Sequence, residues 1–207
     1  MSDKGLTTGT SISPRFPAPF KVRQPNGTLS ACIFTSPHSG ANYPPDFVAV
    51  SRLDPVALRG SEDAFIDELF ASAPDQGSPL LCAAYPRAFV DLNREAWELD
   101  PSMFDGELPH YINTSSQRVT GGLGTIARVV SNGSEIYAGK LAFAEAEQRI
   151  REIYMPYHDT LKNLIVATQQ TQDCAIVVDC HSMPSIGGPM DKDRGRQRAD
   201  IILGDRF

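Results

Sequence analysis

The sequence has little of what several classes of protein function require. Its 207 residues include only four cysteines and four histidines, and the charged residues give a formal net charge of -6. Proteins that bind the phosphate backbone of nucleic acids are usually basic, so we expect no nucleic-acid partner. No apolar run approaches the roughly 20 residues of a membrane helix, and the N-terminus lacks the hydrophobic stretch of a secretory signal. We therefore expect a cytoplasmic protein without membrane contact, and nothing in the sequence indicates an oligomeric state.

The cysteines offer no metal-binding pair. Cys32, Cys82, Cys174 and Cys180 each stand in an apolar run, and none has Cys-X-X-Cys spacing. Zinc sites built from cysteines use such pairs. In a cytosolic protein we expect these four to be small buried hydrophobic residues. Any metal chemistry would then depend on the few histidines.

The chain is 41% hydrophobic and contains 16 glycines and 16 prolines, which suits one globular domain over residues 1–207. Residues 1–27 are rich in Ser, Thr, Pro and Gly and predict a mostly irregular arm. Helical patterns alternate with apolar runs, which favours an α/β fold. The predicted strands are 30–36, 78–84, 88–92, 174–180 and 199–205, of which 174–180 reads as a fully buried parallel strand.

Two helical regions are predicted. Ser61 is a plausible N-cap for a helix that buries Phe65, Ile66, Leu69 and Phe70. A second pattern covers 141–170, and Pro156 should divide it into two helices. The stretch 95–134 has little periodicity and predicts a long functional loop.

Polar side chains follow three of the apolar runs, at His38, at Asn93 and Arg94, and at Asp179 and His181. Functional groups cluster at the carboxyl ends of strands in open α/β sheets. A single histidine after an apolar run is more often structural than a ligand. Two histidines with one carboxylate, however, form a catalytic zinc site with a position open for water. His38 and His181 are the candidate imidazole ligands.

The carboxylate ligand should come from the helix that begins at Ser61, which carries Glu62, Asp63 and Asp67. The alternative is that these acids only complement the dipole of the helix in its first turn. Arg94 follows a buried run, where it could bind a ligand carboxylate in a bidentate manner. Its alternative is an internal ion pair with Asp91 or Glu95.

Seven blocks of the sequence resemble the N-formylglutamate amidohydrolase family, in the order of that family and over nearly the whole chain. They are PHSGANYP at 37–44, DLNRE at 91–95, GLGTIARVV at 122–130, EIY at 135–137, MPYH at 155–158, DCHSMPS at 179–185 and DIILGDRF at 200–207. The resemblance implies the fold of the zinc carboxypeptidases, with three layers and a mixed central sheet between helices. It also implies Zn2+ as the cofactor.

The resemblance assigns roles to several residues. His38, Asn93 with Arg94, and His181 match the order of first zinc ligand, carboxylate-binding pair and second zinc ligand in the peptidases. Those enzymes place a zinc glutamate three residues after the first histidine, where this chain has Ala41, which cannot ligate. The third ligand must come from elsewhere. We expect Asp63 in that role, with Glu62 and Asp67 as reserves.

The implied reaction is hydrolysis of N-formyl-L-glutamate to formate and L-glutamate, as in histidine degradation. Asn93 and Arg94 would hold one carboxylate of this dicarboxylate, and Arg128 is a candidate for the other or for an oxyanion contact; its alternative is a surface cation. Asp179 would orient a ligand histidine, or could be a buried hydrogen-bonded residue. We expect His158 to pack or to support the site, and His110 to be exposed.

A general base must also take a proton from water. In the resembling families this base is a glutamate on a late strand, which here would lie beyond Phe207. We therefore expect that the chain lacks the C-terminal segment of the family and has little hydrolytic activity alone. Two other functions stay open, namely hydrolysis of a related N-acyl amino acid or peptide, and an inactive binding protein that retains the pocket.

Overall fold

A four-stranded mixed sheet forms the centre of the computed structural model, which describes residues 15–188 and 192–204. The strands are β1 (Phe20–Arg23), β2 (Cys32–Ser36), β3 (Leu80–Ala83) and β4 (Ile176–Asp179). Their order is β1-β3-β2-β4, with β2 parallel to both β3 and β4 and with β1 antiparallel to β3. The expected α/β class with a mixed sheet is confirmed.

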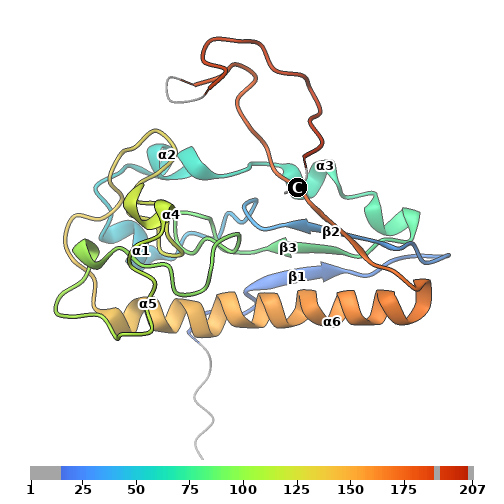
Figure 1. The fold of residues 1–207 in the computed structure, drawn as a ribbon, viewed down its shortest axis with the longest axis horizontal. Coiled ribbons are helices and arrows are strands. Elements are labelled where there is room, and N and C mark those ends of the chain that lie inside the picture. The colour runs from blue at the N-terminus through green and yellow to red at the C-terminus, as the bar shows by residue number, and fades with distance from the viewer. Residues whose placement is uncertain (1–14, 189–191, 205–207) are drawn as a thin grey trace, which may run out of the picture.

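Helices lie on both sides of this sheet (Figure 1), with α5 and α6 along one side and α2 and α3 along the other. The α-helices are α1 (Pro45–Ala49), α2 (Pro55–Leu58), α3 (Ile66–Leu69), α4 (Gln117–Thr120), α5 (Phe143–Arg149) and α6 (Met155–Gln172). A π-helical segment, Ile150–Tyr154, joins α5 to α6, and short 3-10 helices cover Arg59–Ser61, Ala73–Gln76 and Pro101–Met103. No helix in the described part of the chain is long and apolar enough to cross a membrane.

The alternation of side chains along β3 divides the core between the two faces of the sheet. Leu81 and Ala83 belong to the large cluster that also contains Tyr157 of α6. Leu80 and Cys82 belong to a smaller cluster on the opposite face, covered by the segment that follows α3. Successive residues of a strand point to opposite faces, so four apolar residues in a row bury both faces of this inner strand.

The register of the parallel strands determines where the functional groups meet. Thr35 of β2 lies opposite Asp179 of β4, and the Thr35 hydroxyl donates to Asp179 Oδ1 at 2.6 Å. Both strands end at the same edge of the sheet. The segments that carry His38 and His181 therefore leave the sheet side by side.

The predicted helix from Ser61 is wrong in its start and its buried face. Ser61 ends a 3-10 helix, and its hydroxyl accepts a hydrogen bond from the Ser131 backbone N–H instead of capping a helix. The α-helix begins only at Ile66, because Phe65 has a left-handed backbone with a φ of 67°. Ile66 is buried, but Phe65 and Leu69 are 67% and 72% exposed.

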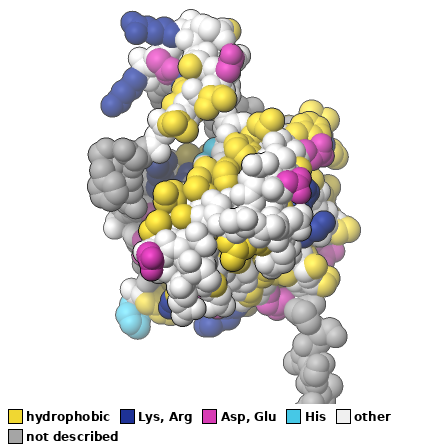
Figure 2. All heavy atoms as spheres, turned by 90° about the vertical axis from the view of Figure 1, so that its right-hand side faces the viewer, with side chains coloured by type: hydrophobic (Ala, Val, Ile, Leu, Met, Phe, Trp, Pro, Cys, Tyr) yellow, Lys and Arg dark blue, Asp and Glu magenta, His cyan; other side chains and the backbone are white. Residues whose placement is uncertain are grey.

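Two predicted strands are also wrong. The run 88–92 is buried but irregular, because Phe89 and Val90 close turns onto the Pro86 carbonyl rather than joining a ladder. The described part of 199–205 contains no strand, and Leu203 there is 93% exposed. β4 was predicted to be fully buried, but among the described residues it lies at the edge of the sheet and Ile176 is 54% exposed. Figure 2 shows the molecule from the right-hand side of Figure 1, where hydrophobic side chains are spread over the surface.

The long helical pattern is divided into two α-helices, α5 and α6, as expected, although the π-helical segment joins them without a break in the chain's helical course. Pro156 stands in the first turn of α6, directly after the π-helical segment. A wider helical turn accommodates the missing proline N–H and the pyrrolidine ring without ending the helix. The N-terminal arm contains β1 and is otherwise irregular in its described part, while residues 1–14 lie outside the described residues.

The stretch 95–134 packs into the core, with Leu99, Phe104 and Ile126 buried, although its backbone is largely irregular. Of the cysteines, Cys82 and Cys180 are buried, Cys32 is half-buried, and Cys174 is exposed, contrary to expectation.

Candidate metal centre

His38 is held in a buried position directly beyond β2. Its Nε2 lies 2.7 Å from Asp91 Oδ1, and the side chain is 2% exposed. Its Nδ1 points to the other side, 3.4 Å from Asp63 Oδ2, and makes no hydrogen bond with any described residue. A buried ring nitrogen without a hydrogen-bond partner is costly unless another group satisfies it.

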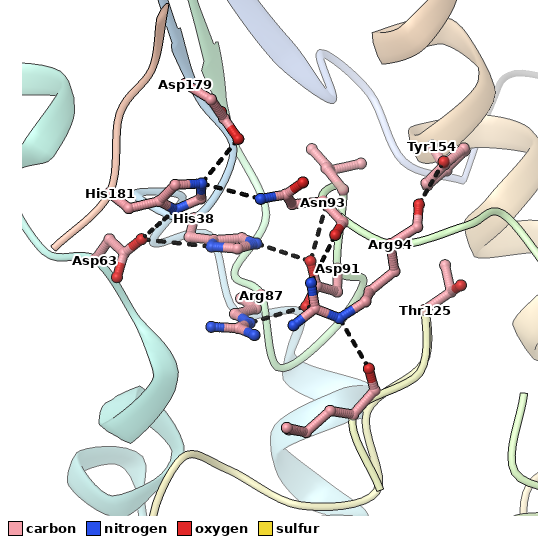
Figure 3. A network of polar contacts seen from close by, with 12 residues as sticks. His38, Asp63, Arg87, Asp91, Asn93, Arg94, Thr125, Tyr154, Asp179 and His181 are labelled. Atoms are coloured by element: carbon pink, nitrogen blue, oxygen red, sulfur yellow. Dashed lines mark hydrogen bonds and ion pairs between the residues drawn. The ribbon is translucent and has the colours of Figure 1, made fainter. Parts of the chain in front are cut away.

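His181 approaches the same carboxylate from the end of β4. Its Nδ1 lies 2.9 Å from Asp63 Oδ2, and its Nε2 lies 2.8 Å from Asp179 Oδ2 and 3.0 Å from Asn93 Nδ2. The centroids of the His38 and His181 rings are 4.8 Å apart. Figure 3 shows both rings turned toward Asp63.

Asp63 is placed by its own backbone as well as by its side chain. Its N–H donates to the His38 carbonyl at 3.0 Å, and its Oδ1 accepts a hydrogen bond from the Ser182 hydroxyl at 3.0 Å. The carboxylate is thereby tied to both histidine-bearing segments. The reserve candidates are not part of this cluster, since Glu62 binds Arg59 and Tyr43 and Asp67 makes no contact with either ring among the described residues.

His38, Asp63 and His181 together could hold a metal ion, because one ligand atom from each lies within 4.8 Å of the others. Two imidazole nitrogens and one carboxylate oxygen are a donor set that zinc accepts, with a further position left open. The His38 Nδ1 is a second indication, because a bound cation would satisfy this buried atom. The residues present therefore fit the metal that the sequence implies.

The charges around the cluster shift several pKa values. Burial alone would raise the pKa of Asp63, but contacts with His181 and His38 outweigh it and hold this pKa well below its ordinary value. The same competition lowers the pKa of Asp91, where His38 and two arginines outweigh burial. It also lowers the pKa of Asp179, through His181 and Thr35. Burial would lower the pKa of His181, but Asp179 and Asp63 raise it to about 9. The carboxylates are thus anions that favour a cation in their midst.

Arg94 lies beside the cluster with its backbone and side chain both held. Its Nε donates to the Leu123 carbonyl at 3.0 Å and its Nη1 donates to the Asn93 carbonyl at 2.7 Å. The Tyr154 hydroxyl donates to the Arg94 carbonyl at 2.6 Å. Arg94 also forms an ion pair with Asp91, at 3.5 Å, which is the internal pairing considered from the sequence. Among the described residues its Nη2 makes no hydrogen bond, so this nitrogen can meet a ligand.

Arg128 is not brought into contact with the ligands described above. Its Nε lies 2.8 Å from Asp100 Oδ2 and its Nη1 lies 3.6 Å from Glu135 Oε1. It lines a cavity of about 260 Å³ with other charged residues, including Arg52 and Lys140. Arg128 is thus an ion-paired cation at a cavity wall, rather than a bare surface charge.

The remaining histidines have surroundings of other kinds. His158 packs on the Tyr154 ring with centroids 4.2 Å apart, and its Nε2 lies 2.8 Å from the Leu92 carbonyl oxygen. Burial lowers its pKa. His110 is exposed beside Tyr111. Neither belongs to the metal cluster.

Two residues near the cluster were not predicted as site residues. Asp91 appeared from the sequence only as a partner of Arg94, and Arg87 was not considered. Asp91 is 1% exposed, and Arg87 Nε lies 2.9 Å from its Oδ2. The sequence does hold a signal for Asp91, because a carboxylate inside an apolar run must find partners when it is buried.

The fold and the cluster together define an α/β protein with a candidate metal centre at the ends of parallel strands. Comparison with known proteins agrees with this class and identifies the family. The chain belongs to the N-formylglutamate amidohydrolase family, whose sequence model matches residues 30–207. The membership expected from the seven sequence blocks is confirmed.

Individual relatives are longer than this chain. It is 24% identical, over 155 residues, to an N-formylglutamate deformylase of Pseudomonas putida, covering 74% of this chain and 52% of that protein. The crystal structure of an N-formylglutamate amidohydrolase from Ralstonia eutropha JMP134 superposes with a TM-score of 0.75 at 34% identity, covering 81% of this chain and 59% of the other. A gene product of Agrobacterium tumefaciens shares the fold, with a TM-score of 0.51 at 19% identity over 86% of this chain and 60% of its own. The chain therefore spans between half and three fifths of the length of these relatives.

Proposed function

We propose that this chain carries the metal-binding and carboxylate-binding part of a zinc-dependent amidohydrolase that converts N-formyl-L-glutamate and water to formate and L-glutamate. The observation that carries the proposal is the buried His38 Nδ1, which faces Asp63 without a hydrogen bond while His181 approaches the same carboxylate. Family membership supports the substrate, since the family is named for this reaction.

The metal would be held by His38, Asp63 and His181. Zinc, when bound there, supplies a Lewis acid that polarises the amide carbonyl and brings the pKa of water toward neutrality. Asp179 holds the far side of the His181 ring by its contact with Nε2, which leaves Nδ1 directed at Asp63. A carboxylate in this position fixes the orientation of a ligand histidine and makes it more basic.

Asn93 and Arg94 would bind one carboxylate of the substrate. The Arg94 side chain is 11% exposed and is held by two backbone carbonyls, so its guanidinium is already ordered before the ligand arrives. Such pre-organisation removes part of the entropy cost of orienting the substrate. Asn93 contacts His181 and precedes Arg94, so it joins the carboxylate-binding residues to the metal ligands.

Arg128 is proposed as the anchor of the second carboxylate. To bind it, Arg128 would exchange its contact with Glu135, which is longer than its contact with Asp100.

The test is to measure zinc content and ligand binding on the purified chain. We expect about one zinc ion per chain after dialysis against zinc, and calorimetric binding of N-formyl-L-glutamate that weakens at least tenfold in an Arg94→Lys variant. Preferential binding of an N-acetyl amino acid or a peptide would instead favour the related hydrolases. A chain that binds no zinc, and whose ligand binding is unchanged by His38→Ala, would favour a binding protein.

A further inference from the structure

We propose that Asp91 is a positioning residue that sets the geometry of the metal ligand His38 and of the arginine Arg94 at the same time. This inference rests on the proposed function, because it assigns Asp91 a role toward the zinc and the substrate carboxylate. It concerns a residue that touches neither of them.

Each oxygen of Asp91 serves a different part of the site (Figure 3). Oδ1 lies 2.7 Å from His38 Nε2 and accepts a hydrogen bond from the Asn93 backbone N–H at 2.9 Å. Oδ2 lies 2.9 Å from Arg87 Nε and 3.5 Å from Arg94 Nε. One buried carboxylate thus stands between the metal cluster and the carboxylate-binding arginine.

The contact at Oδ1 selects the tautomer of His38. An ionised carboxylate only accepts hydrogen bonds, so the shared proton belongs to His38 Nε2. The lone pair of the ring is then on Nδ1, which faces Asp63 Oδ2 at 3.4 Å. Two acceptors that face each other in a buried place repel unless a cation lies between them. Asp91 therefore leaves the His38 Nδ1 lone pair available to a cation bound between His38 and Asp63.

The contacts at Oδ2 keep the carboxylate from turning. Arg87 holds this oxygen, which fixes the plane of the carboxylate and keeps the other oxygen toward His38. Arg94 is attracted to the same atom while two carbonyls hold its guanidinium. Loss of Asp91 would therefore disturb the metal ligand and the substrate arginine together. His181 has a carboxylate partner as well, but Asp179 contacts no arginine among the described residues.

The experiment measures two affinities on the same set of variants. Zinc affinity is measured on the metal-free 207-residue chain by competition with a chromophoric chelator. Affinity for L-glutamate is measured by calorimetry on the zinc-loaded chain. L-glutamate is the product of the proposed reaction, so it is not consumed during the titration. Asp91→Ala should lower the zinc affinity about 10- to 100-fold. It should also lower the glutamate affinity at least tenfold.

The matched control is Glu145→Ala. Glu145 is also paired with an arginine, the buried Arg149, at 3.1 Å, but it contacts no histidine in the part of the chain that the structure describes. The control should lose thermal stability while both affinities stay within twofold of wild type. It separates a specific effect of Asp91 from general loosening of the fold.

Asp91→Asn provides a rescue that a merely structural role would not show. Two donors, His38 Nε2 and the Asn93 N–H, meet Oδ1, so the amide oxygen is favoured on that side and the amide nitrogen faces the arginines. This variant should recover zinc affinity to within about tenfold of wild type and keep the loss of glutamate affinity. If Asp91→Ala fails to fold, the zinc and glutamate affinities of Asp91→Asn test the proposal in its place.

The outcomes separate the two proposals. If the wild-type chain binds no zinc, the proposed function is overturned and this inference with it. If the wild type binds zinc and the Asp91 variants bind it equally well, only the role of Asp91 toward His38 is overturned. If zinc affinity falls while glutamate affinity is retained in Asp91→Ala, the coupling to Arg94 is wrong.

Discussion

Zinc should stabilise the chain against heat, and His38 should be required for this effect. The perturbation is His38→Gln, compared with wild type in the metal-free and zinc-loaded states. Glutamine can still donate to Asp91, but it does not present a ring nitrogen at the place where His38 Nδ1 faces Asp63. The variant should therefore lose the metal ligand atom, His38 Nδ1, while Asp91 keeps a hydrogen-bond donor.

The expected size follows from mass action. A ligand that binds only the folded state, present at about 100 times its dissociation constant, stabilises that state by about 2.7 kcal/mol. In a chain of about 200 residues, each kcal/mol moves the thermal midpoint by roughly 2–4 °C. Zinc should therefore raise the midpoint of the wild type by about 5–11 °C. In His38→Gln the shift should fall below about 2 °C at the same zinc concentration.

The control is His158→Gln, which replaces a half-buried histidine that also has an Nε2 contact, here to the Leu92 carbonyl oxygen. Its metal-free midpoint should fall, because a buried contact is lost, but zinc should still shift it as in the wild type. Circular dichroism melts with zinc, and again after excess chelator, measure both quantities. A wild type without a zinc shift, or a full shift in His38→Gln, would refute the reasoning.

Three further substitutions test the fold around the site. Gly40→Ala should destabilise the chain by more than about 2 kcal/mol, because a Cβ at this position would overlap the Tyr85 carbonyl. Since Gly40 is two residues from His38, the substitution should also weaken zinc binding. Equal urea midpoints for the variant and the wild type would show that the Tyr85 loop can move. Phe65→Gly should stabilise the chain by about 0.5–1 kcal/mol in urea unfolding, because it removes the cost of a left-handed backbone at an exposed residue. A loss of stability would show that the Phe65 side chain has a packing partner. Leu81→Ala should cost about 2–5 kcal/mol, since this side chain is fully buried in the main core, and a cost under about 1 kcal/mol would contradict that packing.

The metal cluster could be approached from the sequence because it follows from strand chemistry. Apolar runs end at His38 and near His181, and parallel strands that are neighbours bring their carboxyl ends together. What the sequence could not supply was the backbone of the Asp63 segment. A helix from Ser61 was expected, whereas the left-handed Phe65 delays α3. Asp63 points to the histidines from a turn, and the hydrophobic periodicity of the sequence does not predict this turn.

Asp91 and Arg128 show a second limit of sequence patterns. The buried run 88–92 has the composition of a strand, yet it folds as turns, so the direction of Asp91 could not be inferred from alternation. Arg128 was recognised as a cation in a glycine-rich stretch, but Asp100 and Glu135, its ion-pair partners, become neighbours only in the folded chain. Periodicity reports burial along one element, while charge pairing depends on how elements meet.

Among the described residues β4 lies at the edge of the sheet, and in the 207-residue chain this position has a consequence for the release of a bound metal. Edge strands with exposed residues open locally at a lower free energy than inner strands. His181 follows β4 directly, whereas His38 follows the inner strand β2. Fraying of β4 would withdraw His181 while His38 and Asp63 stay in place. The dissociation rate of the ion should then follow the hydrogen-exchange rate of the β4 amides, and a substitution that tightens this edge should lengthen the lifetime of the bound metal without changing any ligand.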